Sequence, residues 1–204
     1  MEKIISFDKA LLLQINHFCS PTIDVIMKFI SEIWVWIPLY LIVIFLLFRP
    51  GFYSGKSLIK LQEKLQFNWK VGLIGLLIVV ATFLLNENIA SFVKDTTCRL
   101  RPSHDPSLEN AVRLIDGKGG LYSFYSAHAA NTMCFAVITS LIFKRRLYTL
   151  LTLFWSVSIG YSRIYLARHF PLDVLCGLAA GFITAFLMYL LYSYIIKKYT
   201  KKFA

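Results

Sequence analysis

Blocks of apolar residues long enough to cross a lipid bilayer are the feature that most restricts how this chain can fold. A helix that spans the hydrocarbon core needs about 20 mostly apolar residues. Apolar blocks of 14 to 25 residues cover 35–48, 71–90, 129–143, 147–166 and 172–196. Charged residues make up only 16% of the 204-residue chain, whereas about 25% is usual in a soluble domain. The sequence therefore predicts an all-α, polytopic integral membrane helix bundle with five transmembrane helices.

The placement of the basic residues gives this bundle an orientation. The formal net charge is +11, which in a soluble protein would suggest a nucleic acid partner. Here, however, the basic residues stand in turns and ends that follow alternate apolar blocks, as the positive-inside rule expects of cytoplasmic segments. They are Arg49, Lys56, Lys60, Lys64, Lys70, Lys144, Arg145, Arg146, Lys197, Lys198, Lys201 and Lys202. We therefore expect no nucleic acid partner, a cytoplasmic C-terminus, and the stretches 94–128 and 163–172 on the outer face.

Residues 1–31, which precede the first block, carry apolar residues at helical spacing opposite polar ones. Ser20 and Pro21 divide this segment into two runs, which predicts two amphipathic helices that lie in the outer membrane interface. The alternative is a sixth transmembrane span. A length of 204 residues suits one domain rather than two, so we expect a single domain over residues 1–204.

With this orientation, polar and charged residues gather at the outer ends of four predicted helices. Ionisable groups near the apolar region of a membrane are costly, and they indicate a functional site by default. The residues are Lys94, Arg99 and Arg101 after the second block, Ser126 and His128 before the third, Arg163 in the fourth, and Arg168, His169 and Asp173 around the start of the fifth.

The same region should bind an anion. Ser126 is a suitable N-cap for the third predicted helix, and Pro171 suits the first turn of the fifth. Both helices then direct free N–H groups and the positive end of the helix dipole at one place. Arginine side chains add a planar fork that fits phosphate oxygens. We therefore expect the anion to be a phosphate.

Two histidines and an aspartate in this group indicate nucleophilic chemistry. His169 and Asp173 stand four residues apart, so the carboxylate can hold one ring nitrogen and leave the other free as a nucleophile. His128, on another helix, can donate a proton to a leaving oxygen. This set fits a double displacement through phosphohistidine. A metal site needs three or four neutral or anionic ligands, and because the group is rich in Arg and Lys we expect no metal and no cofactor.

Three motifs in this region carry a resemblance to a known family. They are Lys94-x6-Arg101-Pro102, Tyr125-Ser126-Ala127-His128, and Ser162-Arg163-x5-His169-x3-Asp173. In this order they resemble the three-part signature of the type 2 phosphatidic acid phosphatase (PAP2) superfamily, which includes lipid phosphate phosphatases and vanadate haloperoxidases. The resemblance covers residues 70–195.

The resemblance implies a role for each motif residue. His169 would be the nucleophile, Asp173 its orienting partner, and His128 the acid for the leaving group and then the base for water. The phosphoryl group would be held by Lys94, Arg101, Ser126, the backbone N–H of Ala127, and Arg163.

Two features lie outside the family pattern. The middle motif is usually Pro-Ser-Gly-His, and this chain has Tyr125 and Ala127 instead. Losing glycine at 127 removes backbone freedom but keeps the N–H donor, so we expect the site to survive. Arg99 and Arg168 lie between the motif positions, and each is either a contact for the substrate headgroup or an anchor for a lipid phosphate.

These observations predict a metal-independent phosphatase of membrane lipids in a bacterial inner membrane, with its active site on the outer face. The resemblance implies undecaprenyl pyrophosphate, phosphatidylglycerophosphate or a lipid A phosphate as substrate. One alternative is a phosphotransferase that passes the same phosphoryl group to another lipid. Another is a non-catalytic lipid or anion transporter. The membrane spans argue against vanadate peroxidase chemistry.

Overall fold

The computed structural model describes residues 2–18, 20–49 and 69–201. The basic residues expected on the cytoplasmic side at positions 56, 60, 64 and 202 lie outside the described residues. The described chain is helical, with one isolated bridge between Leu100 and Tyr122 as its extended structure. The prediction of an all-α fold is confirmed. The helices are α1 (Glu2–His17), α2 (Pro21–Ser31), η1 (Ile33–Trp36), α3 (Ile37–Phe48), α5 (Trp69–Thr97), η2 (Pro102–His104), η3 (Pro106–Leu108), α6 (Ala127–Phe143), α7 (Arg146–Tyr165) and α8 (Pro171–Lys201).

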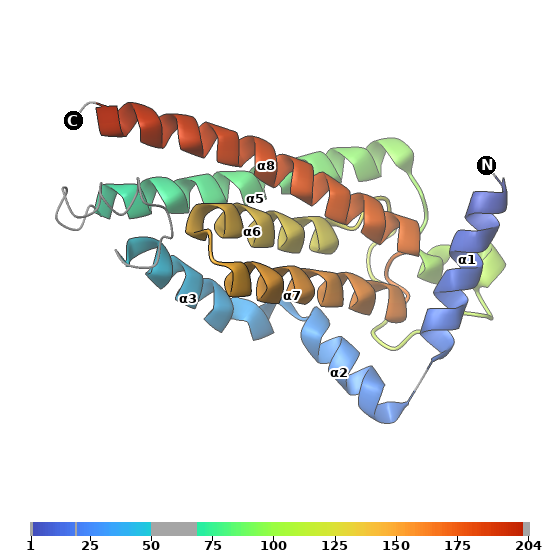
Figure 1. Cartoon of the computed structure of the whole chain (residues 1–204). Coiled ribbons are helices and arrows are strands. Elements are labelled where there is room, and N and C mark those ends of the chain that lie inside the picture. Colours follow the sequence, from blue (N-terminus) through green and yellow to red (C-terminus); the bar gives the residue numbers. More distant parts are fainter. Residues whose placement is uncertain (1, 19, 50–68, 202–204) are drawn as a thin grey trace.

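The centre of the bundle is α6, which packs against α5, α7 and α8 (Figure 1). Thirteen of its 17 residues are buried, and many of them are small, as is common where helices approach closely in membranes. The backbones of α6 and α8 approach so closely that there is no room for a side chain at Gly177. A Cβ added there would lie 2.6 Å from the carbonyl oxygen of Ser126. This close approach places the N-terminus of α6 beside the first turns of α8.

Two of the described helices, α5 and α8, are long and apolar enough to cross a membrane. A third span exists if α2 is joined to η1 and α3, although the chain bends by 66° between these two parts. The α6 helix is apolar but has 17 residues. The five expected blocks each coincide with a helix, whereas the count of five spans stays a prediction.

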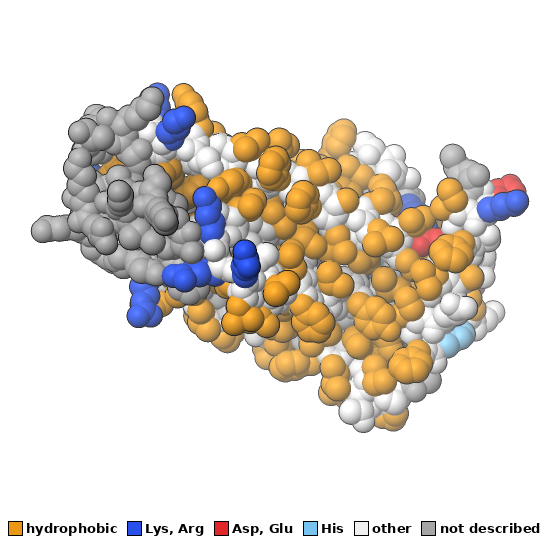
Figure 2. Space-filling view, in the orientation of Figure 1, with side chains coloured by type: hydrophobic (Ala, Val, Ile, Leu, Met, Phe, Trp, Pro, Cys, Tyr) orange, Lys and Arg blue, Asp and Glu red, His pale blue; other side chains and the backbone are white. Residues whose placement is uncertain are grey.

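Apolar side chains cover much of the molecular surface. Figure 2 shows hydrophobic side chains over most of the visible flank between the two ends of the bundle. Exposed leucines and phenylalanines such as Phe45, Leu77, Leu150 and Phe154 contribute to this surface. A continuous apolar surface of this size is typical of a protein that faces lipid or a partner rather than water.

The N-terminal segment forms two helices, as expected, with Ser20 accepting a hydrogen bond from the Ile23 N–H at the start of α2 (3.1 Å). Their position in a membrane interface stays a prediction. The α1 helix lies across the end of the bundle at which α8 begins (Figure 1). Its buried residues are Asp8, Leu12 and Asn16, so the face that packs on the bundle is partly polar, which the apolar spacing did not predict.

Candidate active site

The three motifs meet at the end of the bundle that α1 crosses. The C-terminal part of α5 and the following loop bring Lys94 and Arg101, while Arg163 comes from the last turn of α7. The charges of all three reach both His128, at the start of α6, and His169, in the turn between α7 and α8. The structure therefore brings together the residues that the sequence grouped.

A sharp turn between α7 and α8 positions His169. The chain passes through a left-handed conformation at Ala167 (φ 53°), after which the His169 N–H donates to the Arg163 carbonyl oxygen at 3.2 Å. Pro171 then begins α8, as expected from its fixed φ. The turn buries the His169 side chain, which is only 1% exposed.

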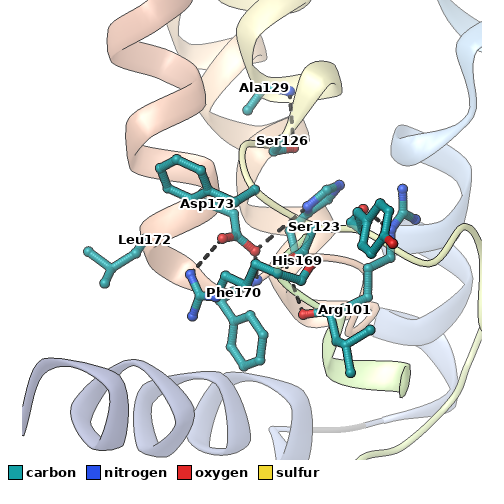
Figure 3. A network of polar contacts seen from close by, with 12 residues as sticks. Arg101, Ser123, Ser126, Ala129, His169, Phe170, Leu172 and Asp173 are labelled. Carbon is teal, nitrogen blue, oxygen red and sulfur yellow. Dashed lines mark hydrogen bonds and ion pairs between the residues drawn. The ribbon is translucent and has the colours of Figure 1, made fainter. Parts of the chain in front are cut away.

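Asp173, in the first turn of α8, lies beside His169 (Figure 3). Its Oδ1 pairs with Arg99 at 2.7 Å. Its Oδ2 accepts a hydrogen bond from the Phe170 N–H at 2.8 Å and lies 3.8 Å from His169 Nδ1. That separation is longer than a hydrogen bond, and Nδ1 makes no other one. A small movement of the ring would complete the pair that orients a catalytic histidine.

The electrostatic surroundings keep His169 neutral. Burial is the main reason that its pKa lies well below its usual range, and the positive charges of Arg163, Arg101 and Lys94 lower it further. At pH 7 the imidazole is therefore unprotonated, which is the form that can attack phosphorus.

The start of α6 provides the second histidine, His128, and the residues Ser126 and Ala127 before it. The Ser126 hydroxyl caps this helix by accepting from the Ala129 N–H at 3.4 Å, as its sequence position predicted. The Ser126 N–H donates to the Asp173 carbonyl oxygen at 3.0 Å. This bond fixes the N-terminus of α6, with Ala127 and His128, against the first turn of α8.

The cations of the site are only partly neutralised. Arg163 is 7% exposed, and although its Nη1 donates to Ser31 Oγ at 2.5 Å, its buried Nε has no hydrogen-bond partner. Arg101 donates through Nε to the Tyr122 carbonyl oxygen at 3.0 Å. Burial and the nearby Arg168 lower the pKa of Arg101, which shows that positive charges crowd here. An anion with several oxygens would relieve this crowding.

The two arginines outside the motif positions are paired with carboxylates. Arg168 Nη2 lies 2.6 Å from Asp116 Oδ2. Arg99 donates to Asp173 and also to Asp8 of α1, at 2.7 and 2.6 Å. The expectation that they contact a headgroup stays a prediction, but the sequence did not reveal their acidic partners.

A cavity of about 620 Å³ extends from the site between α3, α5 and α6. His128 and Asn131 lie in its wall, and Asn131 donates to Glu87 Oε2 at 2.5 Å. The remaining lining is mostly apolar, contributed by Val43, Leu47, Leu76, Val79, Val80, Phe83, Phe135 and Ile138. This cavity, called the groove below, therefore meets the site at Ala127 and His128 and leads away from it along an apolar lining.

A family model described as the PAP2 superfamily matches residues 75–197, which include all three motifs. The chain belongs to this superfamily. The resemblance found from the motifs is thus confirmed.

Asp8 lies outside the segment that the PAP2 model matches, and Arg99 lies within it.

Known PAP2 proteins resemble most of the chain. It is 32% identical over 197 residues to a lipid A 4'-phosphatase of Porphyromonas gingivalis, and the matched segment covers 95% of this chain and 76% of that protein. It is 28% identical over 189 residues to an undecaprenyl-diphosphatase of Sulfolobus acidocaldarius, and this match covers 91% of this chain and 79% of that protein. The crystal structure of a PAP2-type phosphatidylglycerolphosphate phosphatase from Bacillus subtilis aligns with a TM-score of 0.66 at 22% identity, over 96% and 89% of the two chains. The last comparison shows a shared fold.

Proposed function

We propose that this PAP2 protein is a membrane lipid phosphatase that works through a phosphohistidine on His169. The observation that carries the proposal is the buried imidazole of His169, which is 1% exposed and has Asp173 Oδ2 3.8 Å from its Nδ1, with the charges of three cations acting on it. A neutral imidazole is a nucleophile, and the cations favour an anionic substrate over other electrophiles.

In the first step, His169 Nε2 attacks phosphorus and the bond to the leaving oxygen breaks. The bound phosphate anion offsets the nearby cations, so His128 is protonated in the substrate complex and gives this proton to the leaving oxygen. Asp173 stabilises the charge that develops on His169. In the second step, His128 takes a proton from water, the hydroxide attacks phosphorus, and His169 leaves with inorganic phosphate as the product. Lys94, Arg101, Arg163, Ser126 and the Ala127 N–H would hold the phosphoryl oxygens in both steps.

The groove supports a lipid as the leaving group. It begins at His128 and continues along apolar side chains of α3, α5 and α6. An acyl or prenyl chain would lie there with its phosphate beyond His128, toward the cations that act on this histidine. Because the relative with 32% identity is a lipid A 4'-phosphatase, we propose a lipid A phosphomonoester first. Undecaprenyl pyrophosphate and phosphatidylglycerophosphate are the other candidates.

We also propose that all five apolar helices cross the inner membrane as one domain, with the site on the outer face. The supporting observation is that the α6–α7 turn, the start of α5 and the end of α8 lie at the end of the bundle opposite α1 (Figure 1). The described basic residues of these segments would then face the cytoplasm.

The test is phosphate release by the detergent-purified full chain, with EDTA present and His169→Ala as control. The three lipids are assayed in parallel, each with and without a second lipid as acceptor. Release from one lipid, lost in the variant, would support a metal-independent phosphatase and name its substrate. Turnover only in the presence of the acceptor would indicate phosphotransfer instead.

A further inference from the structure

We propose that Asp8, on α1, is a positioning residue for this reaction. It holds one arm of Arg99, and it thereby leaves the second oxygen of Asp173 available to His169. The proposal rests on the proposed function, because it needs His169 to be the nucleophile. It makes α1, which lies outside the PAP2 motifs, part of the catalytic machinery.

The contacts of Asp8 lead directly to the site. The side chain is 2% exposed. Its Oδ1 accepts a hydrogen bond from the Leu172 N–H at 2.9 Å, and its Oδ2 accepts one from Arg99 Nη2 at 2.6 Å. Leu172 is the neighbour of Asp173 in the first turn of α8 (Figure 3). Asp8 therefore satisfies a free backbone donor of α8 and pairs with the arginine that holds Asp173.

The division of the Arg99 donors is the important feature. A guanidinium fork facing one carboxylate commonly donates to both of its oxygens. Here one arm goes to Asp173 Oδ1 at 2.7 Å and the other goes to Asp8. The guanidinium carbon also lies 4.2 Å from the centre of the Phe170 ring, which fixes its position. As a result, Asp173 Oδ2 serves the Phe170 N–H and faces His169.

Without the Asp8 carboxylate, the second arm of Arg99 would lose its anionic partner. The other carboxylate that Arg99 contacts is that of Asp173, so the freed arm would turn to Asp173 Oδ2 and compete with His169 for that oxygen. The imidazole would then be poorly oriented, although the phosphate-binding cations would remain in place. We therefore expect a loss in kcat with little change in KM.

Other contacts hold α1 in place when Asp8 is changed. Asn16 Nδ2 donates to the Tyr165 carbonyl oxygen at 2.8 Å, and its Oδ1 accepts from the Arg113 N–H at 2.8 Å. Lys9 lies 2.6 Å from Asp105. A variant of Lys9 thus loosens the docking of α1 without touching Arg99 or Asp173, which makes it a matched control.

The experiment compares Asp8→Asn with Lys9→Met in the purified full chain, using the lipid that the wild type cleaves. We expect Asp8→Asn to lower kcat about 10- to 100-fold, as a displacement of about 1 Å in a catalytic group does, with KM within about twofold. We expect Lys9→Met to keep kcat within about twofold of the wild type. Asp8→Glu, which keeps the carboxylate, should have a kcat well above that of Asp8→Asn. The double variant Asp8→Asn/Arg99→Gln should be no slower than Arg99→Gln alone, because Asp8 acts through Arg99.

Each other outcome contradicts the proposal. If Asp8→Asn keeps the wild-type kcat, or if its loss equals that of Lys9→Met and follows the same fall in melting temperature, Asp8 has only a structural role. If the wild type releases no phosphate from any of the three lipids, the proposed function fails, and this inference fails with it. An active wild type with an unaffected Asp8→Asn overturns this inference alone.

Discussion

Replacing Asp173 by asparagine tests the catalytic pair with the smallest change of shape. The substitution removes one negative charge but keeps an oxygen that can accept from the Phe170 N–H, now at 2.8 Å. Asp173 is the third residue of α8 and reaches back to the Phe170 N–H, and a neutral amide oxygen can accept this bond as well, so α8 should still begin at Pro171. The change therefore acts mainly on Arg99 and His169.

The expected magnitudes follow from the distances. At 2.7 Å and an effective dielectric constant of about 20, the attraction between Arg99 and Asp173 is about 6 kcal/mol before desolvation is subtracted. Arg99 keeps Asp8 at 2.6 Å, and a buried neutral amide costs less to dehydrate than a carboxylate. We therefore expect the free energy of unfolding to fall by only about 1–3 kcal/mol.

The effect on catalysis should be larger than the effect on stability. An Asp→Asn change beside a catalytic histidine can lower kcat about 10⁴-fold. Here the two groups are 3.8 Å apart, which is a weaker pairing, so we expect kcat to fall about 10²- to 10³-fold, equal to about 3–4 kcal/mol in the barrier.

The assay is steady-state phosphate release, normalised to the folded fraction from gel filtration and circular dichroism. Asp105→Asn is the matched control, because Asp105 pairs with Lys9 away from His169, and it should keep kcat within about twofold. A folded Asp173→Asn protein with kcat within about threefold of the wild type would refute the assignment of Asp173 as the partner of His169.

Two further predictions concern pH and the groove. Because the pKa of His169 is depressed in the folded protein, the unfolded chain binds more protons below about pH 6.5, so stability should fall as the pH drops through that value. Chemical denaturation between pH 5 and 7.5 gives the free energy of unfolding at each pH. Its slope against pH should be smaller in His169→Ala than in the wild type, and equal slopes would contradict the depressed pKa. Filling the groove with Val80→Trp should raise KM for a long-chain lipid phosphate by about tenfold or more, with little change for a short-chain, water-soluble phosphate ester. Equal KM changes for both substrates would show that the tail does not lie there.

The helices and the motif cluster could be predicted because their signals are local. Each apolar block coincides with one helix, and short motifs such as Ser162-Arg163-x5-His169-x3-Asp173 specify the groups that chemistry on phosphate requires. Ser126 and Pro171 could be placed at helix starts for the same reason, since capping depends on immediate neighbours.

The role of α1 could not be predicted from the same signals. Its apolar spacing indicated a helix facing the membrane interface, whereas the buried face also carries Asp8 and Asn16. The partner of Asp8 is 91 residues away along the chain, and no pattern within α1 indicates it. The spacing of Asp8, Leu12 and Asn16, four residues apart on one face, was the available clue. The 66° bend between α2 and α3 likewise depends on packing rather than on composition.

The most direct test of the central claim is to look for phosphate on His169 itself. The wild type, His128→Ala and His169→Ala are mixed with a ³²P-labelled lipid phosphate and quenched in alkali within milliseconds to seconds. The account predicts labelled protein that is stable to alkali and labile to acid. The label should accumulate most in His128→Ala, if the loss of the base slows hydrolysis more than the loss of the acid slows formation, and it should be absent from His169→Ala. Label that persists in His169→Ala, or phosphate release by that variant at the wild-type rate, would contradict the account.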